Sequence, residues 1–380
     1  MTDAAPLLLM TPGPTRVPAR VLRAGARPMI HHRAPEFASE LAVMLELLPP
    51  LFGTHEPVLP VHATGRGALE ATIANLFSAG DAIAVCCNGR FGGLWARIAE
   101  SLGLVVHRVA TDWEHDVDPD EVEAILTGHP EIRAVALPHS DTSTGVANDV
   151  AAVARVARGH DVLMLVDGVS SIGGMPFAFD EWDVDVAVTA SQKCLMSSPG
   201  LSFAVMSARA RSASRTARLP HGYWNFEEIR HEVTKPKPET PGTPPVHLVL
   251  QVVEALRMIH EEGLDAVYTR HEVMSSLVRT GAEALGLTLQ CPELRRRSTT
   301  ITGIRAPSGL PPDRVRQGLK ARGILTAAGL EHYRETAFRI GHMGDIRPAD
   351  VAATLDALAA VLDELRAPSA IVERAGGRLT

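Results

Sequence analysis

The sequence predicts an α/β fold with a mainly parallel sheet, followed by a smaller α+β unit. From residue 64 to residue 205, segments of helical hydrophobic period alternate with short runs rich in Val, Ala and Leu. Such runs are typical of strands that are buried on both faces of a parallel sheet. The 380 residues, of which 46% are hydrophobic, suffice for about two domains with a substantial core.

The elements of the larger unit follow one another in a regular order. Helices are expected at residues 65–77, 92–103, 118–128, 149–159 and, after a Pro-rich stretch, 246–263. Strands are expected at residues 82–87, 104–110, 133–139, 161–168 and 184–190. Asp118 is suited to begin the third helix, because an aspartate side chain at that position accepts a hydrogen bond from a free amide of the first turn.

After residue 263 the pattern changes. Shorter segments at residues 299–307, 313–323, 336–342 and 347–366 predict a compact α+β unit. We therefore expect four parts, which are an N-terminal arm (1–20), a large domain (21–260), a small C-terminal domain (261–367) and a loosely held tail (368–380).

Composition excludes several classes of function. The net charge is −7 and the arginines are scattered, so no basic stripe is available for nucleic acid or an anionic membrane. No apolar run is long enough to span a membrane, and the N-terminus lacks the basic flank of a secretory signal. We expect a cytoplasmic protein. The four cysteines show neither zinc-type spacing nor a disulfide framework, so no metal site is expected.

The loops that follow the predicted strands carry the informative residues, because ligands of open parallel sheets bind beyond the carboxyl ends of the strands. Thr64, Gly65 and Arg66 precede a helix. The free amides of a Gly-rich helix start can bind a phosphate, although such a start also occurs for structural reasons alone.

Three further loops add other chemical groups. Phe91 follows a strand and is either a core residue or a ring that stacks on a planar ligand. The segment "HSDTSTGVAND", which includes Ser143, offers hydroxyls and carboxylates for a turn, a helix cap or a ligand. Asp167 ends an apolar run, where a charge needs a partner; it either caps a turn or faces a cationic ring nitrogen.

Lys193, in "VTASQKCLMSSPG", is one of only four lysines in the chain and follows another apolar run. A lysine in such a place is usually one that extends its ammonium group to solvent. Here it accompanies a phosphate-binding loop, an aromatic residue and a buried carboxylate. Pyridoxal 5′-phosphate (PLP) requires this combination, which includes an amine for a Schiff base, an anion for the pyridine nitrogen and an anchor for the phosphate.

Seven motifs then show a resemblance to a known family. They are "PGPT", "TGRGALEA", "DTSTGV", "VDGVSSIGG", "SQKCL" with its following "SPG", "GTPPV" and "FRIGHMG". In this order they resemble the class V aminotransferases of the alanine–glyoxylate and serine–glyoxylate branch, from about residue 7 to about residue 365. The resemblance implies the fold type I of PLP-dependent transferases, with a large domain on a mainly parallel seven-stranded sheet, a small C-terminal domain and a homodimer.

The resemblance also implies roles for individual residues. Lys193 corresponds to the Schiff-base lysine and Asp167 to the partner of the pyridine nitrogen, which makes these two the catalytic residues. Val169 and Phe91 correspond to the residues on the two faces of the cofactor ring, and Ser143 to the serine near the ring hydroxyl.

The remaining correspondences concern the phosphate and the substrate. The phosphate would be held by Thr64, Gly65, Arg66 and Gln192, with Thr243 reaching it from the second subunit. Arg339 corresponds to the arginine that binds the substrate carboxylate. Arg66 is unusual for the branch: it either points to a substrate with a second anionic group or pairs with a nearby acid.

The sequence therefore predicts a PLP-dependent aminotransferase that moves an amino group from alanine or serine to glyoxylate or pyruvate. Other class V activities remain alternatives, namely pyridoxamine–pyruvate aminotransferase, ureidoglycine–glyoxylate aminotransferase and a cysteine desulfurase that would use Cys291. From other classes of function, a nucleotide-binding module lacks a full phosphate-loop motif. A catalytically inactive regulator is opposed by the combination of Lys193, Asp167 and Arg339.

Overall fold

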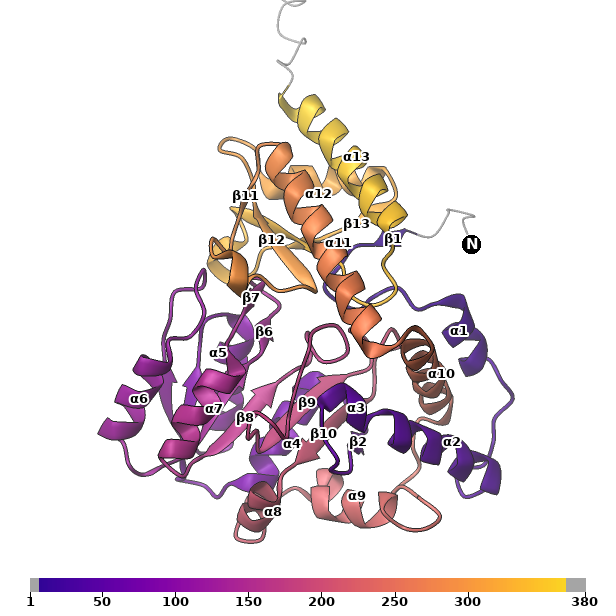
Figure 1. The fold of residues 1–380 in the computed structure, drawn as a ribbon, viewed down its shortest axis with the longest axis vertical. Coiled ribbons are helices and arrows are strands. Elements are labelled where there is room, and N and C mark those ends of the chain that lie inside the picture. The colour runs from indigo at the N-terminus through magenta and orange to yellow at the C-terminus, as the bar shows by residue number, and fades with distance from the viewer. Residues whose placement is uncertain (1–6, 367–380) are drawn as a thin grey trace, which may run out of the picture.

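The computed structural model describes residues 7–366 and confirms the α/β fold class (Figure 1). Its main sheet has seven strands, which are β2 (Leu59–Val61), β3 (Ala82–Cys86), β4 (Val105–Val109), β5 (Ile132–Pro138), β8 (Leu163–Asp167), β9 (Val186–Ala190) and β10 (Ser202–Met206). Their order across the sheet is β2-β10-β9-β8-β5-β3-β4. Only β10 is antiparallel to its neighbours, so the sheet is mainly parallel, as predicted.

Helices cover both faces of this sheet. One layer contains α4 (Gly65–Leu76), α5 (Arg90–Ser101), α8 (Ala208–Ser214) and α9 (Phe226–Val233). The other contains α2 (Pro35–Leu47), α3 (Pro49–Phe52), α6 (Pro119–Gly128), α7 (Val150–Gly159) and α10 (Val246–Glu262). Alternate strand residues belong to opposite layers, which explains why the strands read as continuous apolar runs.

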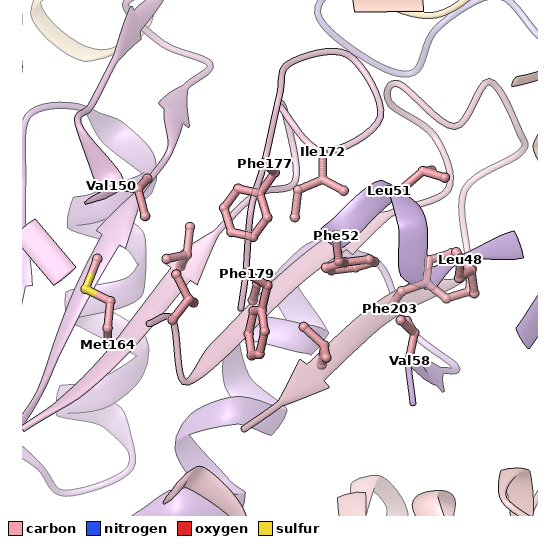
Figure 2. Packing of buried hydrophobic residues seen from close by; sticks show 14 of the residues in the cluster. Leu48, Leu51, Phe52, Val58, Val150, Met164, Ile172, Phe177, Phe179 and Phe203 are labelled. Atoms are coloured by element: carbon pink, nitrogen blue, oxygen red, sulfur yellow. The ribbon is translucent and has the colours of Figure 1, made fainter. Parts of the chain in front are cut away.

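The second layer is rich in aromatic side chains. Figure 2 shows Phe52, Phe177 and Phe179 in the same cluster as Phe203 of β10. All four are almost fully buried. Phe177 and Phe179 belong to the segment between β8 and β9, so the cluster packs this segment against the sheet.

The C-terminal part forms a second, smaller sheet with its own apolar core. The antiparallel strands β11 (Thr288–Leu289), β12 (Ile301–Arg305), β15 (Ala337–Gly341) and β14 (Ala327–Ala328) lie in this order, with α11 (Leu264–Ala284), α12 (Pro312–Ala321) and α13 (Pro348–Arg366) around them. From the other end of the chain, β1 (Leu8–Leu9) pairs with β13 (Ile324–Leu325), and α1 (Ala19–Gly25) packs on α10.

The structure adds elements that the sequence pattern did not predict. Strand β2 has only three residues, one of them a proline, so it is too short to show a strand pattern. Helix α11 was missed because its apolar residues recur only weakly at the helical period. Helices α10 and α11 meet at Gly263, whose φ of 84° lies in the left-handed region that glycine adopts easily. The proposed domain boundary near residue 260 lies in the last turn of α10. The proposed tail, residues 368–380, and residues 1–6 of the arm lie outside the described residues. Within residues 7–366, no helix combines the length and apolar character needed to cross a membrane.

Candidate active site

A cavity of about 280 Å³ lies at the carboxyl ends of the main-sheet strands. Eight of the predicted site residues line it, namely Thr64, Gly65, Arg66, Phe91, Asp167, Val169, Gln192 and Lys193. They come from four loops that are far apart in sequence. The structure therefore brings together the Gly-rich loop at residues 64–66, the aromatic residue, the carboxylate and the lysine, as expected of strand ends that meet at one edge of a sheet.

Lys193 stands in the turn after β9 and faces the N-terminal "PGPT" motif. Its Nζ donates a hydrogen bond to the carbonyl oxygen of Pro12. A Cβ atom on Gly13 would lie only 2.6–2.8 Å from the outer atoms of the lysine side chain, so only glycine leaves room for it. Thr15 also joins the two segments, because its amide donates to Gln192 O at 3.1 Å and its hydroxyl donates to Lys193 O at 3.1 Å.

The surroundings of Lys193 favour its neutral amine. Burial, followed by the positive charge of Arg339, lowers the pKa of Lys193 from 10.5 to about 8. The carboxylate of Asp167 acts in the opposite direction but is weaker. A lysine with a pKa near 8 is still mostly protonated near physiological pH, but its neutral, nucleophilic fraction is far larger than that of an ordinary lysine.

Asp167 is the last residue of β8 and is 6% exposed. Its Oδ1 accepts a hydrogen bond of 2.9 Å from the amide of Val169. Burial raises the pKa of Asp167 from 3.8 to about 6, although the Val169 amide lowers it. A buried carboxylate whose pKa is raised by burial is stabilised in its charged form when a cation lies against it.

The start of α4 provides free amides. Gly67 and Ala68 donate to Thr64 O at 2.8 and 3.2 Å, whereas the amides of Gly65 and Arg66 have no acceptor within the described residues. These two donors and the positive end of the helix dipole suit an anion. The Arg66 side chain is exposed at the same cavity and makes no ion pair with an acid in the described part of the chain.

Two neighbouring contacts complete this end of the cavity. Gln192 Oε1 is buried and has no hydrogen-bond partner within residues 7–366, so it is available to a ligand. A Cβ on Gly65 would lie 2.7 Å from Val169 Cγ2, so the glycine allows α4 to approach the loop after β8.

Asp141 orders the loop that carries Phe91, a role that sequence reasoning missed. Its Oδ2 accepts from the amides of Phe91 at 2.8 Å and Gly92 at 3.3 Å. Helix α5 has no side-chain cap of its own, because Gly89 precedes it. A Cβ on Gly89 would clash with the Asp141 carboxyl group. In the sequence, the only indication of this packing is Gly89, since a glycine just before a helix can leave room for a buried side chain.

The prediction for Ser143 needs a correction. Ser143 does not line the cavity; its hydroxyl donates to Asp141 Oδ1 at 2.5 Å and accepts from the amide of Arg90 at 3.0 Å. The preceding residue, Thr142, lines the cavity with Ser170, and their hydroxyls are hydrogen-bonded. Ser143 therefore supports the loop, because adjacent residues of a tight turn point in different directions, and Thr142 takes the place next to the cavity.

Arg339 approaches the cavity from β15 of the smaller sheet. It is 6% exposed, and its Nη1 donates to Thr142 O at 2.6 Å while its Nε donates to Ala328 O at 2.8 Å. Burial lowers the pKa of Arg339 to about 10. Arg339 is not among the residues that line the cavity, but its guanidinium contacts the backbone of Thr142, which does.

Comparison with known proteins agrees with this arrangement. The profile of the family described as "Aminotransferase class-V" matches residues 9–345. The chain belongs to the class V aminotransferases. Among curated relatives of this aminotransferase, the L-aspartate–glyoxylate aminotransferase of Paracoccus denitrificans is 37% identical (92% of this chain, 89% of the relative). A protein named soluble hydrogenase, small subunit, from Synechococcus sp. is 39% identical (96% and 94%).

Solved structures of the family superpose closely on this aminotransferase. The alanine–glyoxylate aminotransferase of Nostoc sp. has a TM-score of 0.90 at 31% identity, with 95% of this chain and 96% of that chain covered. The pyridoxamine–pyruvate aminotransferase of Mesorhizobium loti also has a TM-score of 0.90, at 27% identity (97% and 95%). A cysteine desulfurase of Thermococcus onnurineus is only 16% identical at a TM-score of 0.73, and shares the fold alone.

Thr243 does not reach the cavity within one chain of this aminotransferase. It lines a separate hollow of about 280 Å³ with His62, Tyr223 and Trp224. Tyr223 is 75% exposed. The predicted contact of Thr243 with the phosphate therefore needs a second copy of the chain.

The cysteines are not placed for desulfuration. Cys291 does not line the cavity; its thiol donates to Glu293 O at 3.5 Å, and burial raises its pKa to about 11. Cys194 points away from the cavity toward Ser170 O at 3.6 Å, and burial raises its pKa to about 12. Neither thiol has the exposure or the low pKa of a reactive cysteine.

Proposed function

We propose that this class V aminotransferase uses PLP bound at Lys193 to move the amino group of alanine or serine to glyoxylate or pyruvate. The observation that carries the proposal is the pairing of a low-pKa lysine and a high-pKa aspartate on one cavity. Buried groups of opposite type with displaced pKa values are characteristic of catalytic sites.

The residues present fit this cofactor. The amides of Gly65 and Arg66, the Thr64 hydroxyl and Gln192 would hold the phosphate, and Asp167 the pyridine nitrogen. Phe91 and Val169 would enclose the ring. When bound, PLP supplies an electron sink for the bond broken at the substrate α-carbon. Thr243 would reach the phosphate from the second subunit of a homodimer, whose formation we propose on the same ground.

Lys193 is proposed as the group that moves the proton. Its neutral amine can accept the proton from the substrate α-carbon and return it at the neighbouring cofactor carbon, as general base and then acid. The Pro12 carbonyl orients this amine.

Arg339 is proposed to bind the α-carboxylate of either substrate. We expect Arg339→Lys to lower kcat/KM for the amino donor by roughly 100-fold, because a point charge cannot reproduce the planar pair of hydrogen bonds. Steady-state kinetics with saturating acceptor measures this. Arg322→Lys, at the exposed residue that follows α12, is the matched control and should leave kcat/KM unchanged. Equal kcat/KM in Arg339→Lys and wild type would remove Arg339 from the substrate site.

Visible spectroscopy of the purified holoenzyme tests the proposed function. Titration with alanine or serine, without an acceptor, should bleach the yellow colour of the Lys193-bound cofactor, and glyoxylate or pyruvate should then restore it. The donor that bleaches the enzyme at the lowest concentration identifies the substrate. A protein that binds no PLP would contradict the proposal. Turnover of free pyridoxamine instead would favour the pyridoxamine–pyruvate activity.

One observation favours a second candidate donor. The Arg66 side chain stands at the cavity without an acidic partner in the described residues, and could bind the second carboxylate of an acidic amino acid. Aspartate therefore belongs in the same titration. If aspartate bleaches wild type but loses this ability in Arg66→Ala while alanine keeps it, the donor is a dicarboxylate.

A further inference from the structure

A cluster of metal-ligand side chains lies at the edge of the main sheet, apart from the cavity. His107 belongs to the edge strand β4, His129 directly follows α6, and Glu131 precedes β5. Residues distant in sequence are thus gathered where α6 returns to the sheet. One nitrogen from each histidine and one carboxylate oxygen all lie within 4.8 Å of one another.

Two of the three separations between ligand atoms match those of a zinc site. His107 Nε2 and His129 Nδ1 lie 3.5 and 3.3 Å from the same oxygen, Glu131 Oε1. Tetrahedral zinc with bonds of about 2.0–2.1 Å places its ligand atoms roughly 3.3–3.4 Å apart. The histidine rings are 4.0 Å apart and inclined by 39°, so a modest rotation would direct both nitrogens to one ion.

The hydrogen bonding of His107 also favours a ligand. His107 Nε2 is buried and, although it lies 3.5 Å from Glu131 Oε1, makes no hydrogen bond in the described part of the chain. A buried ring nitrogen without a partner is unfavourable, and a metal ion would satisfy it. The side chains of His129 and Glu131 are 42% and 56% exposed, which leaves an open approach and space for water as a fourth ligand.

The neighbouring arginines do not compete for Glu131. Arg108 pairs with Glu100, and Arg133 pairs with Asp81. The Glu131 carboxylate is held mainly by its own backbone amide and by His129, and both lower its pKa. No ion pair with Arg108 or Arg133 would have to break for the carboxylate to bind a cation together with the two histidines.

We propose that His107, His129 and Glu131 bind one zinc ion per chain. Two imidazoles and a carboxylate are the ligand set that suits zinc. The ion would tie the edge strand β4 to the turn between α6 and β5. Because the three ligands are brought together only by the fold, zinc would bind the native state and stabilise it against unfolding.

Isothermal titration of the holoenzyme with zinc sulfate, in phosphate-free buffer after dialysis against EDTA, tests the proposal. We expect one equivalent bound in wild type. His129→Asn removes an exposed ligand with little risk to the fold, and should weaken binding at least about tenfold, as should His107→Asn and Glu131→Gln. His115→Asn is the matched control, because His115 is a similarly exposed histidine beside an acid, Asp112.

A second readout does not depend on calorimetry. Zinc should raise the Tm of wild type and His115→Asn by a few degrees, and should not raise that of His129→Asn. Two results would overturn the proposal: wild type that binds no zinc, or His129→Asn that binds zinc as tightly as wild type, which would place the ion on cysteines or other histidines.

Discussion

Replacing Lys193 with alanine is expected to lower kcat at least about 1,000-fold without unfolding the protein, because the variant would lose both the proposed attachment point of the cofactor and the proposed proton carrier. The substitution removes few interactions that stabilise the fold, because Lys193 Nζ makes a hydrogen bond only to Pro12 O within the described residues. Measurement of kcat together with the Tm separates chemistry from stability. Lys320→Ala, which removes a lysine on the surface helix α12, should leave both values unchanged.

Two further measurements sharpen this prediction. Added methylamine should partly restore kcat to Lys193→Ala, since a small free amine can fill the space and carry the proton. Cofactor uptake by wild-type apoprotein should accelerate as pH rises toward 8, because deprotonation of an amine with a pKa near 8 creates the nucleophile. A Lys193→Ala variant with near-normal kcat would exclude Lys193 as the catalytic amine.

The parts of the site that could be predicted from sequence are those set by local order. Lys193 and Asp167 each follow an apolar run, and the ends of parallel strands meet at one edge of the sheet. The same rule places the Gly-rich start of α4 beside them. The sequence pattern and the geometry of a parallel sheet were sufficient to predict that these residues lie together, and they line one cavity in the structure.

Contacts between segments that are distant in sequence could not be predicted from the sequence pattern. The bond from Lys193 to Pro12 joins residues 181 positions apart, and no periodicity indicates it. The turn at residues 141–145 decides whether Thr142 or Ser143 faces the cavity, and a shift of one residue reverses the outcome. His107 is likewise brought to His129 only by the pairing of β4 in the sheet.

Asp167→Asn is the second substitution with a large expected effect, and we expect kcat to fall roughly 100- to 1,000-fold. Asparagine has the same shape and can still accept the Val169 amide. It cannot hold a proton on the pyridine nitrogen, because it carries no negative charge, so the ring would withdraw electrons less strongly. Asp185→Asn is the control, since Asp185 is a buried acid that pairs with Arg209 and does not line the cavity; its kcat per folded molecule should be unchanged.

The stability of the apoprotein distinguishes an electrostatic role of Asp167 from a structural one. The folded state raises the pKa of Asp167 from 3.8 to about 6, so between these pH values it binds more protons than the unfolded chain. The contribution of Asp167 to stability therefore falls as pH rises through this window. Asp167→Asn removes that loss, and at pH 7 its apoprotein should unfold at a Tm equal to or above that of wild type. A lower Tm together with normal kcat would mean that Asp167 serves the fold rather than the cofactor.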